Sequence, residues 1–426
     1  MTQAPSNDLA ARRAALTLLD AALERRGGID EAAAAGPLKS LDARDRAFAR
    51  ALTLSTLRRL GAIDRLLAPK LNREPPPRIR NLLRLGVAQL FWFDTPDHAA
   101  VSTSVDIAAA DKAGRAFKGL VNAVLRGLLR DGPPADDPEA LCPPWLYARW
   151  TNAWGPEAAR AIAAQIAGEP ATDLTVRENG DIELLTAQLE ATALPGGTVR
   201  VTQRGDVAQW PGFAEGRWWV QDAAAAIPAR LLHANAEQTA LDLCAAPGGK
   251  TLQLAVTGAR TVAVDRSEER LKRVTENLAR MGLTAEVIAA DAGRWDDERT
   301  FDAVLLDAPC SATGTFRRHP DVLWAAAPGD IAKLAAVQSR LLDSAAMRTA
   351  PGGRLVYCVC SLEPEEGEGQ VRAFLNRHPE FSNEPCAEGE GGAPAASLTR
   401  EGWLRLLPHQ REGGQDGFFA ARLKRN

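Results

Sequence analysis

The chain has 426 residues, 46% of them hydrophobic and 25% charged, and a net charge of −3 at neutral pH. A chain of this length is expected to form two or three domains, and its near-neutral charge argues against a protein that only coats nucleic acid. No apolar run approaches the length of a membrane helix, and the N-terminal stretch lacks the features of an export signal. We therefore expect no membrane association and a cytoplasmic location.

The six cysteines are too few and too scattered for the disulfide framework of a secreted protein. Cys310 lies in DAPCSATG, while Cys358 and Cys360 lie in YCVCS. No CxxC pair and no histidine at metal-ligand spacing accompanies them, so no metal site is expected. Thiol chemistry or simple burial are the remaining explanations.

Helical periodicity runs from residue 8 to about 130, with Leu9, Leu16, Leu19 and Leu23 on one face. Residues 1–131 contain 21 Lys and Arg against 14 Asp and Glu, a balance of +7, which leaves −10 for the remainder. A basic, all-helical region fits an RNA-binding module, although an Arg-rich solvated surface explains the charge equally well. A Pro-rich polar stretch predicts a domain boundary near 131–140.

Residues 140–235 combine a helix candidate at 156–168 with short alternating segments, which predicts a small α+β unit. We interpret Trp145, Trp150 and Trp154 as helix core rather than as a platform for stacked bases. From 236 to 426 apolar strands alternate with helices, a pattern that predicts a parallel sheet with crossover helices. The expected strands are TALDLC, TVAVD, AEVIAAD, FDAVLLD and GRLVYCVC, the expected helices are 250–256, 267–281 and 330–348, and the last segment is expected to return to the sheet.

The segment LDLCAAPGGKT leads from the first of these strands through a Pro-Gly-Gly turn into a helix. Gly248 and Gly249 allow the backbone to turn tightly and to approach a ligand at the carboxyl edge of the sheet. Asp265 ends the second strand, where a carboxylate can accept hydrogen bonds from ribose hydroxyls. Asp291 and Asp307 end the next two strands. Neither GxGxxG nor GxxxxGK is present, so the pattern favours an adenosine cofactor over a dinucleotide or a nucleoside triphosphate, with a purely structural turn as the alternative.

Cys310 and Cys360 follow the fourth and fifth strands and are expected at the same rim. A thiolate that adds to C6 of cytosine makes C5 nucleophilic; methyl transfer, loss of the C5 proton and β-elimination then restore the ring. Cys360, Cys310 and Asp307 are available as nucleophile, elimination group and acid. A single cysteine is more often buried in a core, but the shared position beside the turn favours catalysis. Cys358, two residues earlier on the same strand face, is the main rival nucleophile.

Ionisation of Cys360 would need a positive group or a helix N-terminus close to its sulfur. We expect a helix to follow Ser361 and consider Lys250 as the second source of help. Arg317, Arg318 and His319 follow Cys310 and could hold RNA phosphates, with a solvated turn as the alternative.

Four motifs closely resemble those of the bacterial RNA 5-methylcytidine methyltransferases: LDLCAAPGGKT, VAVDRSEERLKRVTENLARMGL, DAPCSATGTFRRHPD and CVCSLEPEEGEGQV. Residues 1–131 resemble a NusB-type RNA-binding domain, a combination that is similar to members acting on 16S ribosomal RNA. The resemblance implies a Rossmann-like class I methyltransferase domain over 236–426 that uses S-adenosylmethionine. It also implies Cys360 as nucleophile and Cys310 as the cysteine that promotes release of the product.

The cofactor-binding residues implied by the resemblance lie in the first two motifs and at the strand ends. They are Cys244, Ala245, Ala246, Pro247, Gly248, Gly249, Lys250, Asp265, Arg270, Asp291 and Asp307. The family usually has Thr directly before the nucleophile, whereas this chain has Val359. The missing hydroxyl bears on how the reactivity of Cys360 is tuned more than on which residue is the nucleophile.

The expected partner is RNA, in particular 16S ribosomal RNA, and the expected state is a monomer. Two alternatives remain open. One is the same chemistry on transfer RNA or DNA, and the other is a non-catalytic RNA-binding or assembly factor that has kept the fold. The presence of both cysteines and every strand-end acid argues against the second.

Overall fold

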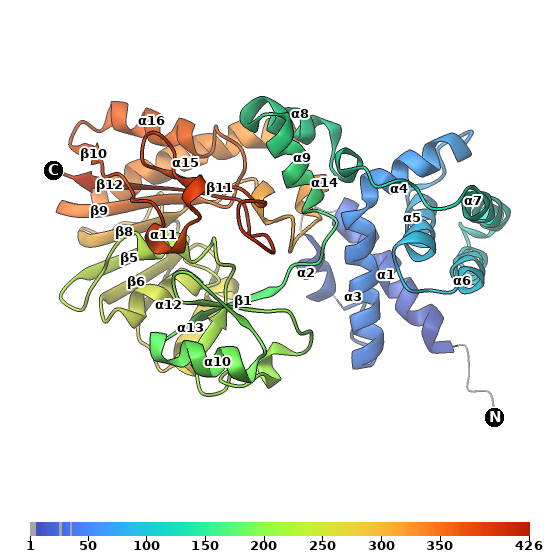
Figure 1. The fold of residues 1–426 in the computed structure, drawn as a ribbon, viewed down its shortest axis with the longest axis horizontal. Helices are drawn as coiled ribbons and strands as arrows, with labels where there is room; N and C mark the ends of the chain where they lie inside the picture. Colours follow the sequence, from blue (N-terminus) through green and yellow to red (C-terminus); the bar gives the residue numbers. More distant parts are fainter. Residues whose placement is uncertain (1–5, 25–27, 35) are drawn as a thin grey trace. The chain divides into compact units, whose positions relative to one another are not determined.

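The computed structural model describes residues 6–24, 28–34 and 36–426, which form two compact units (Figure 1). The first unit comprises the chain up to Glu169 together with Phe316–Ala326; the second comprises Pro170–Thr315 and Ala327–Asn426. These units do not coincide with the three predicted segments 1–131, 140–235 and 236–426. The three-segment division therefore stays a prediction about folding units.

The first unit is helical, as predicted: within its described residues no strand occurs. Leu16 and Leu19 are buried in its core, and Leu9 and Leu23 pack against it, so the predicted apolar face is confirmed. The helices of this unit are α1 (Ser6–Glu24), α2 (Gly28–Ala34), α3 (Ala43–Arg58), α4 (Leu60–Leu67), α5 (Pro77–Phe91), α6 (Asp97–Ala110), α7 (Lys118–Asp131), α8 (Pro144–Trp154), α9 (Pro156–Ala164) and α14 (Val322–Ala325).

The segment Phe316–Ala326 belongs to the helical unit although the sequence around it forms the sheet of the second unit. The Phe316 ring lies 5.9 Å from that of Trp150, which is fully buried on α8. The Trp324 indole donates to the Leu57 carbonyl at 3.3 Å at the end of α3. The interpretation of Trp150 as helix core is confirmed, and Trp145 and Trp154 are half-buried.

A small antiparallel sheet opens the second unit, in the order β2 (Thr192–Leu194), β3 (Thr198–Val201), β1 (Thr172–Val176) and β4 (Trp218–Val220), with α10 (Ile182–Gln188) beside it. The strands and α10 agree with the α+β character predicted for 140–235, whereas the helix predicted at 156–168 is α9 of the first unit. Arg200 and Asp173 of adjacent strands form a buried ion pair at 2.7 Å. Gln221, just after β4, donates to Gln253 at 2.9 Å and so ties this sheet to α12 (Gly249–Val256).

The larger sheet has the order β10 (Phe381–Asn383), β12 (Phe418–Arg425), β9 (Thr349–Val359), β8 (Phe301–Asp307), β5 (Thr239–Leu243), β6 (Arg260–Asp265) and β7 (Glu286–Ala289), while β11 (Leu404–Leu406) pairs with β12. The five predicted strands β5 to β9 are parallel to one another, as predicted. β12 and β10 extend the sheet antiparallel. The last segment thus returns to the sheet, as expected.

Helices cover both faces of this sheet (Figure 1). Val304 and Leu306 of β8 pack on the face of α15 (Pro328–Arg348) and α16 (Glu368–Arg377). Ala303 and Leu305 pack on the opposite face, with α11 (Ile227–Arg230) and α12. Because both faces of these strands are buried, their sequences are almost continuously apolar.

Helix α13 (Glu268–Met281) begins and ends as predicted. The Ser267 hydroxyl accepts from the Arg270 N–H at 3.3 Å, and Gly282 follows the helix with φ +62°. Leu271 and Val274 are buried. Helix α13 runs from the end of β6 back to β7, which brings the carboxyl ends of both strands to one edge.

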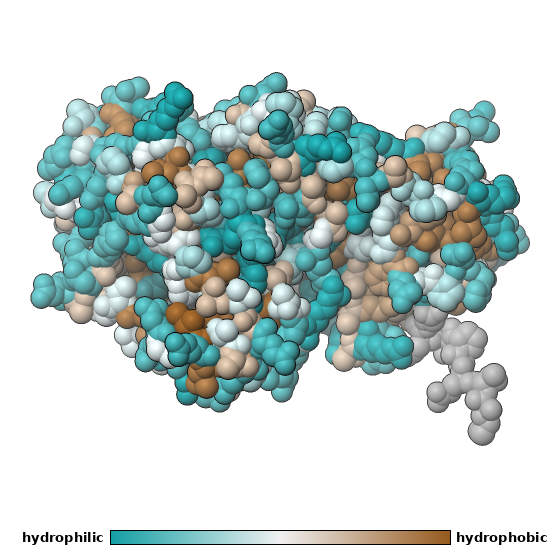
Figure 2. Space-filling view, in the orientation of Figure 1, coloured by the Kyte–Doolittle hydropathy of each residue, from teal (hydrophilic) through white to brown (hydrophobic). Residues whose placement is uncertain are grey.

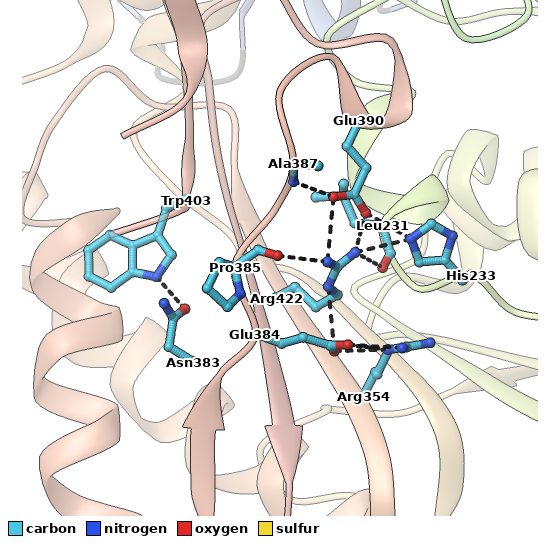
Figure 3. Close-up of polar contacts among 10 residues, drawn as sticks. All are labelled: Leu231, His233, Arg354, Asn383, Glu384, Pro385, Ala387, Glu390, Trp403 and Arg422. Carbon is cyan, nitrogen blue, oxygen red and sulfur yellow. Dashed lines mark hydrogen bonds and ion pairs between the residues drawn. The ribbon is translucent and has the colours of Figure 1, made fainter. Parts of the chain in front are cut away.

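The last strand is fixed by Arg422, whose guanidinium is buried among the elements around it (Figure 3). It donates to the carbonyls of Leu231 at 3.1 Å and Pro385 at 3.0 Å. It also forms ion pairs with Glu390 and, at 3.4 Å, with Glu384. This network joins β12 to the segment after α11 and to the loop after β10.

Among the residues that the structure describes, no helix is both long and apolar enough to cross a membrane. In the view of Figure 2, hydrophobic residues lie in separate patches between hydrophilic ones.

Candidate active site

The turn after β5 has one backbone conformation that favours glycine, at Gly248, and close contacts at both of its glycines. Gly248 has φ +106°, and a Cβ there would lie 3.1 Å from the Val274 side chain of α13. A Cβ on Gly249 would lie 3.2 Å from the amide of Gln221. The turn is therefore held closely between α13 and the small sheet, and side chains larger than glycine would displace it.

Asp265, at the end of β6, lies against this turn and is buried. Its carboxylate accepts from the backbone N–H groups of Ala246 at 3.1 Å and Ser267 at 2.9 Å. The Arg270 guanidinium donates to the Ala246 carbonyl from the first turn of α13. Each carboxylate oxygen has a second lone pair, so Asp265 keeps the capacity to accept hydrogen bonds from hydroxyl groups.

Two of the predicted acids differ in their surroundings. Asp291 lies two residues beyond the end of β7 and is exposed, with one oxygen accepting from the Gly293 N–H at 2.9 Å. Asp307 is the last residue of β8, and its carboxylate accepts from Lys250 Nζ at 2.7 Å. The structure therefore brings together Lys250, at the start of α12, and Asp307. The hydrogen bond to Asp291, by contrast, comes from Gly293 in the same loop.

The sulfur atoms of Cys310 and Cys360 lie 3.5 Å apart, so the two loops after β8 and β9 meet as predicted. The neighbouring Cys360 thiol and burial raise the pKa of Cys310 well above its usual value. Cys358 is fully buried, and its thiol donates to Asp307 Oδ1 at 3.5 Å. Burial and the Asp307 charge raise the pKa of Cys358 as well, so a neutral thiol is favoured at this position.

A helix follows Ser361, as expected, but this helix, α16, begins only at Glu368 and so does not place its N-terminus next to Ser361. The Ser361 carbonyl accepts from Arg405 Nη1 at 2.6 Å, and the Ser361 hydroxyl accepts from the Glu363 N–H at 3.0 Å. The bond from Arg405 occupies the carbonyl that would accept the first hydrogen bond within a helix starting at Ser361. Lys250, the other expected source of positive charge, is paired with Asp307.

The expectation for Arg317 also changes. Its side chain is 4% exposed, and its carbonyl accepts from Arg58 Nη1 at 2.7 Å within the helical unit. This burial argues against an open phosphate-binding group at Arg317. Arg318 and His319 are half-buried, and their role stays a prediction.

Glu366 is a site residue that sequence reasoning missed. It is fully buried and accepts hydrogen bonds from the hydroxyls of Ser311 and Ser361, each at 2.5 Å. The signal was present in the sequence, since each of the paired cysteines is followed directly by a serine and the second motif contains a run of glutamates. No spacing rule connects these groups, because 50 residues separate the serines.

Comparison with known proteins identifies two family models within the chain. Residues 229–424 match the family described as 16S rRNA methyltransferase RsmB/F, and residues 9–130 match the NusB family. The ribosomal RNA small subunit methyltransferase B of Pseudomonas syringae pv. tomato is 40% identical over 411 residues, covering 91% of this chain and 90% of the relative. The protein of the same name from Cronobacter sakazakii is 36% identical over 401 residues, covering 89% and 90%.

Solved structures show the same similarity. The crystal structure of PH0851 aligns with a TM-score of 0.81 at 25% identity and covers 100% of both chains. A methyltransferase homolog protein from Pyrococcus horikoshii aligns with a TM-score of 0.57 at 26% identity, covering 71% of this chain and 98% of that structure. The predicted Rossmann-like domain and NusB-type region are thereby confirmed. The chain belongs to the RsmB/F family of S-adenosylmethionine-dependent rRNA methyltransferases and carries an N-terminal NusB-family domain.

Proposed function

We propose that the chain methylates C5 of a cytosine in 16S ribosomal RNA through a covalent bond between Cys360 Sγ and C6 of the base. The observation that carries this proposal is the 3.5 Å distance between the sulfur atoms of Cys310 and Cys360 at the carboxyl edge of the sheet. Two thiols in contact suit a reaction in which one sulfur attacks and must later leave.

The half-buried Cys360 is the attacking group in this scheme. Addition of its thiolate to C6 forms the S–C bond, opens the C5–C6 double bond and moves electron density to C5, while Asp307 stabilises the charge at N3 or N4. Bound S-adenosylmethionine supplies the methyl group for C5. Loss of the C5 proton to a base and cleavage of the S–C6 bond then restore the aromatic ring.

Cys310 assists the last step in this scheme. Its raised pKa keeps it as a neutral thiol, which can donate a hydrogen bond to the sulfur of Cys360 3.5 Å away. A donor at that distance stabilises the thiolate that departs from C6. Cys358 is the weaker candidate for nucleophile, because it is fully buried and already donates to Asp307.

The cofactor turn fits the adenosine part of S-adenosylmethionine. Gly248 and Gly249 keep the turn free of side chains, and Asp265 has lone pairs left for the two ribose hydroxyls. Asp291 is exposed and retains acceptor capacity. Arg270 is assigned a different part: it donates to the Ala246 carbonyl and so fixes the turn.

The substrate is proposed from two observations. Relatives that match about 90% of the chain are named for the ribosomal RNA of the small subunit. Residues 9–130 match the NusB family within a region of net charge +7, which suits an RNA-facing domain. We further propose that the protein acts as a monomer in the cytoplasm.

A methyl-transfer assay with 16S ribosomal RNA from cells lacking the gene tests this function, and bisulfite sequencing locates the product. We expect one protected cytosine with the wild-type protein. Cys360→Ala should abolish transfer while S-adenosylmethionine still binds, and the matched variant Cys358→Ala should retain it. Near-normal turnover by Cys360→Ala, or a methyl group on an atom other than C5, would reject the proposal.

A further inference from the structure

Glu366 joins the two cysteine loops through four donors. Its carboxylate accepts from the hydroxyls of Ser311 and Ser361, each at 2.5 Å. It also accepts from the Ser311 N–H at 2.9 Å and from Gln338 Nε2 of α15 at 3.0 Å. Glu366 itself is fully buried, and a buried carboxylate is stable only when such donors surround it.

The two serines directly follow the two cysteines. Ser311 follows Cys310 on the loop after β8, and Ser361 follows Cys360 on the loop after β9. A single carboxylate therefore binds the residue that directly follows each of the two cysteines. A second link supports this arrangement, since the Gly314 N–H donates to the Cys360 carbonyl at 3.0 Å.

We infer that Glu366 is a positioning residue that sets the distance between the sulfur atoms of Cys310 and Cys360. An ionised carboxylate only accepts, in fixed directions, so four donors on one carboxylate define where each loop lies. Gln338 extends the control to α15, because its amide also donates to the Pro309 carbonyl at 3.0 Å, one residue before Cys310. The consequence for catalysis rests on the proposed function, but the spacing does not.

The charge of Glu366 also affects the Cys310 thiol. It contributes to the raised pKa of Cys310, after the neighbouring Cys360 and burial. The group that fixes the Cys310 loop thus also favours a neutral thiol there, which is the form that can donate to the Cys360 sulfur.

The spacing can be measured without methyl transfer, by the rate at which diamide oxidises the two thiols to a disulfide. Diamide takes up the two electrons and two protons that the thiols release, and mass spectrometry of peptides identifies the Cys310–Cys360 bond. We expect Glu366→Ala to slow this step about tenfold or more, because misplacement by about 1 Å strongly reduces reaction between positioned groups. Glu365→Ala, an exposed neighbour, is the matched control and should react at the wild-type rate.

Glu366→Gln separates geometry from charge. A glutamine keeps an oxygen for the Ser311 N–H and Gln338, and its amide can donate to the serine hydroxyls after they rotate. We expect Glu366→Gln to restore the oxidation rate and most of kcat, and Glu366→Ala to lower kcat with KM for S-adenosylmethionine within about twofold of wild type.

Unchanged oxidation in a folded Glu366→Ala protein would overturn the inference. If that variant does not fold, the double variant Ser311→Ala/Ser361→Ala removes only the two hydroxyl links and is expected to slow oxidation too. A wild-type rate in the double variant would also overturn it. Failure of the proposed function would instead show as activity in Cys360→Ala, which leaves the oxidation result unaffected.

Discussion

Lys250 Nζ lies 2.7 Å from Asp307 Oδ2, an ion pair that joins the glycine turn after β5 to the end of β8. The side chains are 10% and 29% exposed. Burial alone would lower the pKa of Lys250, but Asp307 and the nearby Cys358 raise it above its usual value. The lysine thus neutralises the acid of the site instead of activating Cys360.

This ion pair should couple the two residues in a double-mutant cycle. With Lys250→Met and Asp307→Asn, we expect a coupling energy of about 1–2 kcal/mol in urea unfolding at pH 7.5, because part of Asp307 is exposed to screening solvent. Since the folded-state pKa of Lys250 is raised, this stabilisation is present below about pH 10 and is lost as pH rises further. Additive effects of the two substitutions would contradict the coupling.

Features with local signals could be predicted from the sequence. The α13 helix is an example, because the Ser267 cap and the Gly282 stop lie at its own ends. The parallel strands were recognisable since both of their faces are buried. The meeting of Cys310 and Cys360 followed from their positions at strand ends, where parallel strands converge on one edge.

Features that depend on contacts between distant residues were not predicted. The helix expected after Ser361 does not start there, because Arg405, 44 residues away, binds the Ser361 carbonyl. Glu366 was missed for a similar reason, since its donors come from two loops and from α15. Arg317 is buried because the segment Phe316–Ala326 belongs to the helical unit, which its own stretch of sequence does not reveal.

Replacing Cys310 should trap the reaction after methyl transfer. In Cys310→Ala, the Cys360 sulfur loses the donor that lies 3.5 Å away, so departure from C6 slows. We expect a covalent protein–RNA complex that survives denaturing electrophoresis. Its absence from Cys310→Ala/Cys360→Ala is the control that assigns the bond to Cys360, and rapid release of methylated RNA by Cys310→Ala would refute the role.

Asp242 of β5 should make stability depend on pH in an unusual direction. Its Oδ2 accepts from the Thr251 hydroxyl at 2.6 Å, while its Oδ1 has no hydrogen-bond partner in the described part of the chain. Burial raises the pKa of Asp242 to about 7, against the opposing effects of Thr251 and Lys250. The folded state therefore holds one more proton than the unfolded state between about pH 4 and 7.

The contribution of Asp242 to the free energy of unfolding should fall as pH rises through that window, by at most about 1.4 kcal/mol per pH unit. Asp242→Asn cannot titrate, so its stability relative to wild type should rise from pH 5 to pH 7 and level off above pH 8. Urea unfolding of both proteins at four pH values measures the difference. A constant difference across the series would show that Asp242 titrates near its ordinary pKa.

A substitution of Arg422 tests what holds β12 in the sheet (Figure 3). Its guanidinium is 6% exposed and pairs with Glu390 and Glu384. Arg422→Met removes the charge but keeps much of the length, and it takes the buried cation away from the half-buried carboxylates of Glu390 and Glu384. We expect a loss of about 2 kcal/mol, below the range for a fully buried pair, because both carboxylates keep contact with water and Arg354 still binds Glu384 at 2.8 Å.

Lys424→Met, two residues along the same strand and exposed, is the matched control for Arg422→Met. It should change the free energy of unfolding by less than about 0.5 kcal/mol, as surface substitutions usually do. Urea unfolding monitored by circular dichroism compares the two variants with wild type. Equal effects of the two substitutions would mean that apolar packing of β12, rather than the Arg422 network, holds the strand. The large difference is expected because Arg422→Met leaves the Leu231 and Pro385 carbonyls and the half-buried Glu390 carboxylate without this donor, whereas Lys424 is exposed.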